Sequence, residues 1–252
     1  MKTFLESMVV AFGMYSKLPM PKIEWNNRNM KYCICFFPLI GLAIGLLENL
    51  WYVLAVHLGT GQSLMAAVLV VIPLAVSGGI HMDGLLDTSD AIGSWRTQEE
   101  RLEIMKDSHS GAFAIIAAVV FILLDFAGMT EVTSSTVRLI GIGFILSRAY
   151  SGFGLLMLKK AKNTGLLRTF SDMAANKRAA VVMVCWILAS SLAMICLDPL
   201  RGSILAGLAL LTFFWYRSMA YRQFGGITGD VAGFFLQICE LVIVLGAAFM
   251  KL

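Results

Sequence analysis

Three aspartates follow an apolar run in the segment GGIHMDGLLDTSDAIG, residues 78–93. Asp83, Asp87 and Asp90 are spaced i, i+4 and i+7, so that a helix would place their carboxylates within about 40° of one another. No lysine or arginine lies between Asp83 and Arg96 to balance these charges. Oxygen ligands without neighbouring cysteine favour Mg²⁺ or Mn²⁺, which bind through few carboxylates and leave positions for phosphate oxygens. The spacing therefore predicts a magnesium site, with a solvated charged face as the alternative.

A second polar segment, RLEIMKDSHSGAFA at residues 101–114, leads into another apolar run. Asp107 could complete the carboxylate set as a fourth metal ligand. Arg101 and Lys106 carry the positive charge that phosphate oxygens need, and Ser108 lies beside them as a further substrate contact. An amphipathic connector with i,i+3 charge pairs would have the same composition, and the segment alone does not decide between the two.

A glycine-rich turn, YRQFGGITGDVAG at residues 221–233, precedes the last apolar run. Gly226 and Gly229 would let backbone N–H groups approach a phosphate, and the following helix would present its N-terminus to an anion. Thr228 and Asp230 lie in the same turn and are candidate substrate contacts. A plain helix cap is the alternative.

Ionisable residues also occur inside the apolar runs, among them Glu48, Arg148 and Glu240. Such charges are costly in a bilayer and are normally paired or face a wet cavity, so Arg148 and Glu240 are candidate substrate contacts. A purely structural pair between them is the alternative. His81 is a candidate for a hydrogen bond to substrate or to a carboxylate; zinc bound by His81 and His109 is less expected because cysteine is absent from the neighbourhood.

The elements that must position these groups follow from composition. The 252 residues are 58% hydrophobic and 14% charged, which excludes an ordinary soluble domain. Runs of roughly 20 apolar residues can cross a bilayer as helices. The sequence therefore predicts an all-α, polytopic integral membrane bundle with about seven transmembrane helices. The candidate spans are 33–56, 64–80, 112–128, 137–158, 180–197, 203–219 and 231–250.

The first 21 residues differ from these spans. Their apolar side chains recur at helical spacing, but Glu6 and Lys17 interrupt them, and Pro19 and Pro21 end the stretch. This pattern predicts an interfacial amphipathic helix, with a cleaved signal peptide as the alternative.

Lysines and arginines gather in alternate loops, at 1–32, 81–111, 159–179 and 217–230. By the positive-inside rule these loops face the cytoplasm, and the candidate active site faces it with them. The protein is expected to be a multi-pass protein of the bacterial cytoplasmic (inner) membrane, in contact with the lipid bilayer. The same asymmetry accounts for the net charge of +4, so no nucleic-acid partner is expected.

Four segments in this order, GGIHMDGLLDTSD, RLEIMKDSHSG, SRAYSG and GGITGDVAGFFLQICELV, resemble the cobalamin synthase family, the adenosylcobinamide-GDP ribazoletransferases. The resemblance spans nearly the whole chain and implies one membrane-embedded catalytic domain over 1–252. It implies a magnesium-dependent transferase that joins α-ribazole, or α-ribazole 5′-phosphate, to adenosylcobinamide-GDP, with release of GMP. A homo-oligomer, or a complex with other cobalamin-assembly enzymes, is a further expectation.

Residue chemistry and resemblance together predict the roles in this site. Mg²⁺ would be held by Asp83, Asp87, Asp90 and Asp107, and Asp83, Asp87 and Asp107 would be catalytic. Substrate contacts would come from His81, Arg101, Lys106, Ser108, Arg148, Gly226, Thr228, Gly229, Asp230 and Glu240.

Two other functions fit parts of the sequence. A CDP-alcohol phosphotransferase also carries helix-borne aspartates, but its pattern needs Ala-Arg where this chain has Asp87-Thr88. A cation transporter would use intramembrane acids as a pathway and would need broken helices at the bilayer midplane. Most of the acids here cluster near one membrane surface instead.

Overall fold

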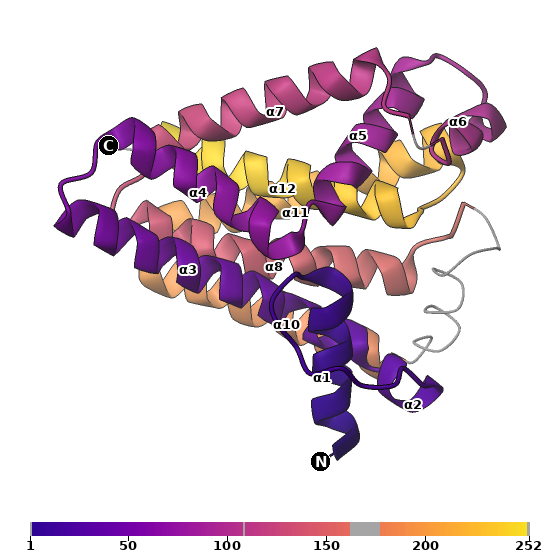
Figure 1. Ribbon diagram of the computed structural model, residues 1–252, viewed down its shortest axis with the longest axis horizontal. Helices are drawn as coiled ribbons and strands as arrows, with labels where there is room; N and C mark the ends of the chain where they lie inside the picture. The colour runs from indigo at the N-terminus through magenta and orange to yellow at the C-terminus, as the bar shows by residue number, and fades with distance from the viewer. Residues whose placement is uncertain (1, 108, 162–176, 251–252) are drawn as a thin grey trace.

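Helices make up almost all of the computed structural model, which describes residues 2–107, 109–161 and 177–250 (Figure 1). Ser108, a predicted substrate contact, lies outside these ranges. The helices are α1 (Lys2–Tyr15), α2 (Asn27–Met30), the 3₁₀ turn η1 (Cys33–Phe36), α3 (Phe37–His57), α4 (Gln62–Ser77), α5 (Ile80–Gly93), α6 (Gln98–Ile104), α7 (Ala112–Thr130), α8 (Thr136–Met157), α10 (Lys177–Leu197), α11 (Pro199–Phe224) and α12 (Gly229–Phe249).

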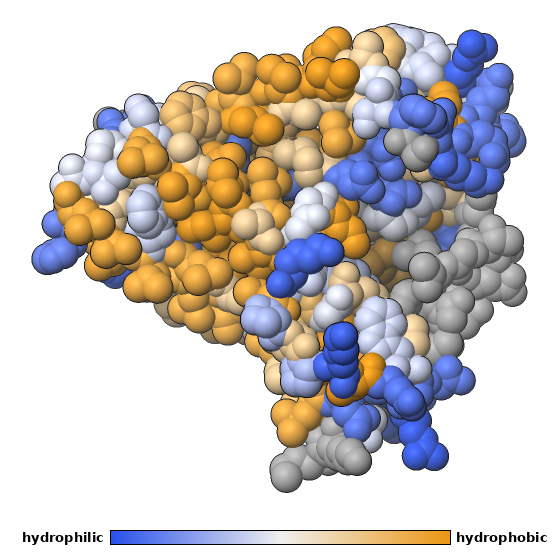
Figure 2. Space-filling model, in the orientation of Figure 1, coloured by the Kyte–Doolittle hydropathy of each residue, from blue (hydrophilic) through white to orange (hydrophobic). Residues whose placement is uncertain are grey.

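Six helical units are long and apolar enough to cross a membrane: η1 with α3, α7, α8, α10, α11 and α12. The pair α4 and α5 passes the same test as one bent unit, so the described residues supply up to seven spans. An apolar surface covers the length of the bundle, and hydrophilic residues gather at the end that carries α5 and α6 (Figure 2). The predicted all-α, polytopic membrane bundle is confirmed.

The centre of the bundle is formed by α8 and α12. In each of them 72% of an apolar 18-residue segment is buried inside the protein. The corresponding share in α10 is 17%, which leaves α10 to face lipid. Small residues let α3 pack closely on α8, because a Cβ on Gly41 or Gly45 would overlap the α8 backbone at Phe144 or Gly141. These contacts hold the spanning helices together and so support the polar end of the bundle.

The predicted span 64–80 ends early. Helix α4 stops at Ser77 because Gly78 and Gly79 adopt left-handed φ angles of +64° and +80°, and α5 leaves at 94° to α4. The chain after α1 buttresses this bend: the Lys17 N–H donates to the Val76 carbonyl at 2.8 Å, and the Lys17 side chain lies against Gly78. The bend therefore sets the direction of α5, the helix that carries Asp83, Asp87 and Asp90.

Helix α1 forms where an amphipathic helix is predicted and lies across the direction of the spanning helices (Figure 1). Val10 and Ala11 are fully buried against Cys33 and Phe36, while the Phe4 side chain remains 64% exposed. An exposed apolar side chain on a crosswise helix suits the predicted place at the membrane interface.

Candidate active site

The aspartates of α5 lie where α5 crosses the start of α12. Gly84 makes the crossing close: a Cβ there would lie 2.6 Å from the backbone carbonyl oxygen of Asp230. Gly233, one turn further along α12, also lies beside α5, but more loosely, since a Cβ there would be 3.4 Å from the His81 backbone. The close approach at Gly84 therefore brings Asp230 to the helix that carries Asp83 and Asp87.

We define the acidic cluster as Asp83, Asp87 and Asp230. Its carboxylates repel one another. Asp87 is half-buried, and its carboxylate is repelled by the negative charges of Asp83, Asp230 and Asp90. Asp230 is likewise opposed by Asp83. Such a group of carboxylates is stabilised by a cation or by a bound proton.

Asp90 has a different local role. Its carboxylate accepts hydrogen bonds from the Gly111 N–H and, at 3.0 Å, from the Ala114 N–H. These are unsatisfied donors at the beginning of α7, so Asp90 caps that helix from a neighbouring one. A Cβ on Gly111 would lie 2.7 Å from the Asp90 carboxylate, so glycine is needed for this contact. The predicted metal role of Asp90 would compete with this capping.

Asp107 interacts with His109 rather than with the acidic cluster. Its carboxylate accepts a hydrogen bond from the His109 N–H at 3.0 Å and lies 2.8 Å from His109 Nδ1. The backbone hydrogen bond, followed by that of the ring, holds the pKa of Asp107 below its usual value. Lys106 forms an exposed ion pair with Glu103 at 2.8 Å. The structure places both predicted site residues on a solvated loop.

Arg101 lies on α6 and binds the end of α11. Its guanidinium donates to the side-chain oxygen of Gln223 and, at 3.4 Å, to the Gln223 carbonyl. Gln98 adds a hydrogen bond of 2.9 Å to the Arg222 carbonyl. Helix α6 is thus fixed against the C-terminal end of α11, close to the glycine-rich turn.

The glycine-rich turn has one tightly packed end and one open end. A Cβ on Gly226 would lie 2.6 Å from the Ala161 nitrogen, because Ile227 pairs with Lys159 and Ala161 through hydrogen bonds of 2.8 and 3.0 Å. A Cβ on Gly229 would meet no described atom within 4 Å. Thr228 caps α12 by accepting from the Val231 N–H. Gly226 therefore serves backbone packing, and the open end of the turn lies at Gly229.

Arg148 and Glu240 form a buried ion pair of 2.6 Å, with their side chains only 1% and 7% exposed. Arg148 also donates to the Phe144 carbonyl at 3.0 Å, and the Ser147 hydroxyl donates to Glu240 at 2.9 Å. Of the two possibilities that the sequence left open, this geometry favours the structural pair. His81 is also buried, against the Phe37 ring at 5.7 Å, and its Nε2 has no hydrogen-bond partner among the described residues.

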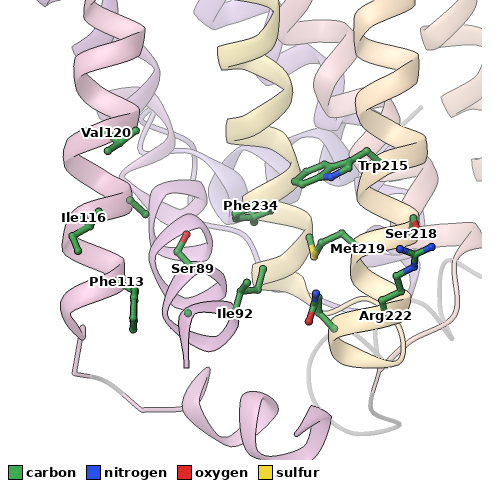
Figure 3. Close-up of a pocket in the computed structure, with 13 residues that line it drawn as sticks. Ser89, Ile92, Phe113, Ile116, Val120, Trp215, Ser218, Met219, Arg222 and Phe234 are labelled. Carbon is green, nitrogen blue, oxygen red and sulfur yellow. The ribbon is translucent and has the colours of Figure 1, made fainter. Parts of the chain in front are cut away.

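A groove of about 700 Å³ opens between α7 and α11, with α5 and α12 behind it. Figure 3 shows Phe113, Ile116 and Val120 of α7 on one side of the groove and Trp215 and Met219 of α11 on the other. Ser89 of α5, Ser218 and Arg222 add polar groups. The groove and the acidic cluster thus share helix α5. The volume of the groove is typical of small-molecule sites.

The model of one protein family, described as cobalamin-5-phosphate synthase, matches residues 7–248. The chain belongs to this family. Similar proteins named adenosylcobinamide-GDP ribazoletransferase support the assignment. The protein of Lachnoclostridium phytofermentans is 44% identical over 95% of this chain and 92% of its own length, and that of Clostridium perfringens strain 13 is 30% identical over 97% and 98%. No solved structure matches.

Membership of the cobalamin-5-phosphate synthase family confirms the resemblance found in the sequence. The family that matches, together with the names of the relatives, favours this function over the CDP-alcohol phosphotransferase and transporter alternatives.

One buried acid on α7, Asp125, is not among the site residues predicted from the sequence; it is 7% exposed. The charges of Asp125 and Glu240 both act on Glu48, which is fully buried. Neither carboxylate oxygen of Glu48 has a hydrogen-bond partner within the part of the chain that the structure describes. A cavity of about 10 Å³, on the order of one water, lies beside Asp125, Gln237 and Glu240. The signal was present, because Asp125 is an acid within the predicted span 112–128.

Proposed function

We propose that this member of the cobalamin-5-phosphate synthase family transfers the cobinamide-phosphate group of adenosylcobinamide-GDP to α-ribazole or α-ribazole 5′-phosphate. The names of its relatives support this reaction. The structural observation that carries it is the close crossing of α5 and α12 at Gly84, which gathers Asp83, Asp87 and Asp230 beside an open helix N-terminus. A diphosphate ester needs such a site, since its charge must be offset and its oxygens oriented.

The reaction exchanges one phosphorus–oxygen bond for another. A hydroxyl of ribazole attacks the phosphorus nearest cobinamide, a new P–O bond forms, and the bond to GMP breaks. The hydroxyl proton needs an acceptor, and we assign this role to Asp87, because its partial burial and then three neighbouring carboxylates favour its protonation. The N–H groups at the open turn around Gly229 would bind the departing phosphate.

We propose Mg²⁺ as the cofactor of this site. The donor set of the acidic cluster, three carboxylates with no sulfur ligand, suits a hard cation. Within residues 2–107, 109–161 and 177–250, no three acidic, histidine or cysteine side chains enclose a metal by themselves. Mg²⁺ ordinarily takes only one or two carboxylates and completes its shell with water and phosphate. When bound, it would offset charge on the diphosphate oxygens.

The decisive experiment is GMP release by purified protein in detergent, with adenosylcobinamide-GDP, α-ribazole and Mg²⁺. Asp83→Asn should lower kcat more than tenfold, about 1.4 kcal/mol in the barrier, and raise the Mg²⁺ concentration needed for half-maximal rate. Glu99→Gln, which changes an exposed acid on the neighbouring α6, is the matched control and should retain full activity. Retention of more than a tenth of the activity in Asp83→Asn would remove Asp83 from the site.

We further propose that the acidic cluster faces the cytoplasm. Helix α6, the glycine-rich turn and the end of α8 lie at the same end of the bundle as α5 (Figure 1). Their loops carry most of the lysines and arginines. Reporter fusions after Lys160 and Thr228 should report the cytoplasm, and a fusion after Thr60 should report the outside. An external signal at Lys160 or Thr228 would contradict this orientation.

A further inference from the structure

The groove between α7 and α11 is mostly apolar, but its composition changes toward the end near α6. Its aromatic side chains come from three helices: Phe113 of α7, Trp215 of α11 and Phe234 of α12. Phe113 and Trp215 are 49% and 47% exposed, so both present ring surface to an incoming molecule. Figure 3 shows Arg222 and Ser218 close together on α11, on the side away from α7.

The groove is also fixed to the catalytic helix. Ser89 and Gly93 of α5 line it, and the Phe113 ring packs so closely on Gly93 that no Cβ would fit there. Asp90, between these two residues, holds the beginning of α7 through its hydrogen bonds to the Gly111 and Ala114 N–H groups. A molecule in the groove would therefore lie against the same helix that carries the acidic cluster.

The chemistry of the lining selects a flat, apolar ligand that carries one anionic group. Aromatic walls favour an aromatic ring system through stacked or edge-to-face contacts. A guanidinium at the polar end favours a phosphate, to which it can donate two parallel hydrogen bonds. Ribazole is a ribonucleoside whose base is a dimethylated benzimidazole, an apolar bicycle, and its 5′-phosphate supplies the anion.

We propose that this groove is the acceptor subsite, with the benzimidazole base between Phe113 and Trp215 and the 5′-phosphate of α-ribazole 5′-phosphate on Arg222. The inference rests on the proposed function and adds to it the place of the acceptor. It also makes Arg222 the residue that distinguishes α-ribazole 5′-phosphate from free α-ribazole, since only the phosphorylated acceptor carries the charge that Arg222 binds.

The test compares the two acceptors in Arg222→Gln. The KM for α-ribazole 5′-phosphate should rise about tenfold or more, while the KM and kcat for free α-ribazole stay within about twofold of those of the parent protein. Retained turnover of free α-ribazole shows that the variant is folded and that the transferase reaction is intact. The matched control is Arg217→Gln on the same helix, whose guanidinium lies over the Tyr221 ring and outside the groove.

A second variant tests the aromatic wall. Trp215→Leu should raise the KM of both acceptors by a similar factor and leave the KM for adenosylcobinamide-GDP unchanged. Equal KM changes for both acceptors in Arg222→Gln would overturn the assignment of the phosphate to Arg222. Unchanged acceptor KM values in both variants would show that the acceptor binds elsewhere and would overturn the proposal. Neither result would affect the transferase activity itself, which GMP release by the parent protein decides independently.

Discussion

The buried pair of Arg148 and Glu240 gives a large effect on stability that can be worked out in advance. Arg148→Met removes the guanidinium and leaves Glu240, 7% exposed, without its ionic partner. Breaking a buried pair in this way costs about 3–5 kcal/mol, because an uncompensated charge stays in an apolar environment. The upper part of that range is expected, because the positive charge of Arg148 also acts on the fully buried Glu48.

The assay is thermal unfolding in detergent. For a chain of this size, 1 kcal/mol corresponds to about 2–4 °C, so a loss of about 4–5 kcal/mol in Arg148→Met should lower Tm by roughly 8–20 °C. Arg138→Met, an exposed arginine near the start of the same helix, is the control and should change Tm by less than about 2 °C.

The double variant Arg148→Met/Glu240→Met decides the mechanism. It removes both charges and leaves apolar side chains of suitable length, so most of the lost stability should return. A double variant less stable than Arg148→Met alone would refute the reasoning, since it would show that the guanidinium stabilises the bundle by contacts other than its pairing with Glu240.

Three further predictions concern the polar end of the bundle. Gly84→Ala places a Cβ 2.6 Å from the Asp230 carbonyl and should lower kcat for GMP release at least tenfold by separating α5 from α12. Gly226→Ala should lower Tm because it overlaps the backbone of residues 159–161, whereas Gly229→Val should leave Tm unchanged and raise the KM for adenosylcobinamide-GDP. Asp90→Ala removes two capping hydrogen bonds and should cost about 1–2 kcal/mol, seen first as faster hydrogen exchange at the start of α7.

The spanning helices could be predicted because length and hydropathy alone decide whether a helix crosses a bilayer. The predicted span 137–158 corresponds to α8, Thr136–Met157. The bend after Ser77 could not be found in this way, because two consecutive glycines with left-handed φ leave the hydropathy of the run unchanged. A hydropathy profile reports the composition of a segment and does not report a change in the direction of the helix.

The candidate site could be predicted only in part. Asp83 and Asp87 are close in sequence, so helical spacing was enough to place them together. Asp230 reaches them through the crossing at Gly84, a contact between segments far apart in the chain. Asp107 is near in sequence but interacts with His109, and its metal role stays a prediction. For Arg148 and Glu240 the sequence leaves two alternatives, substrate contacts or a structural pair, and the packing that brings them together across 92 residues favours the pair.

The contact between Lys17 and the α4–α5 bend has a consequence for the choice of membrane mimetic. The Lys17 N–H is bonded to the Val76 carbonyl and its side chain covers Gly78, so α1 cannot change depth without disturbing the bend that directs α5. A detergent micelle that lets α1 leave the interface would loosen this joint while the spanning helices stay packed. Turnover should therefore be higher in lipid nanodiscs than in small micelles, at equal thermal stability of the bundle.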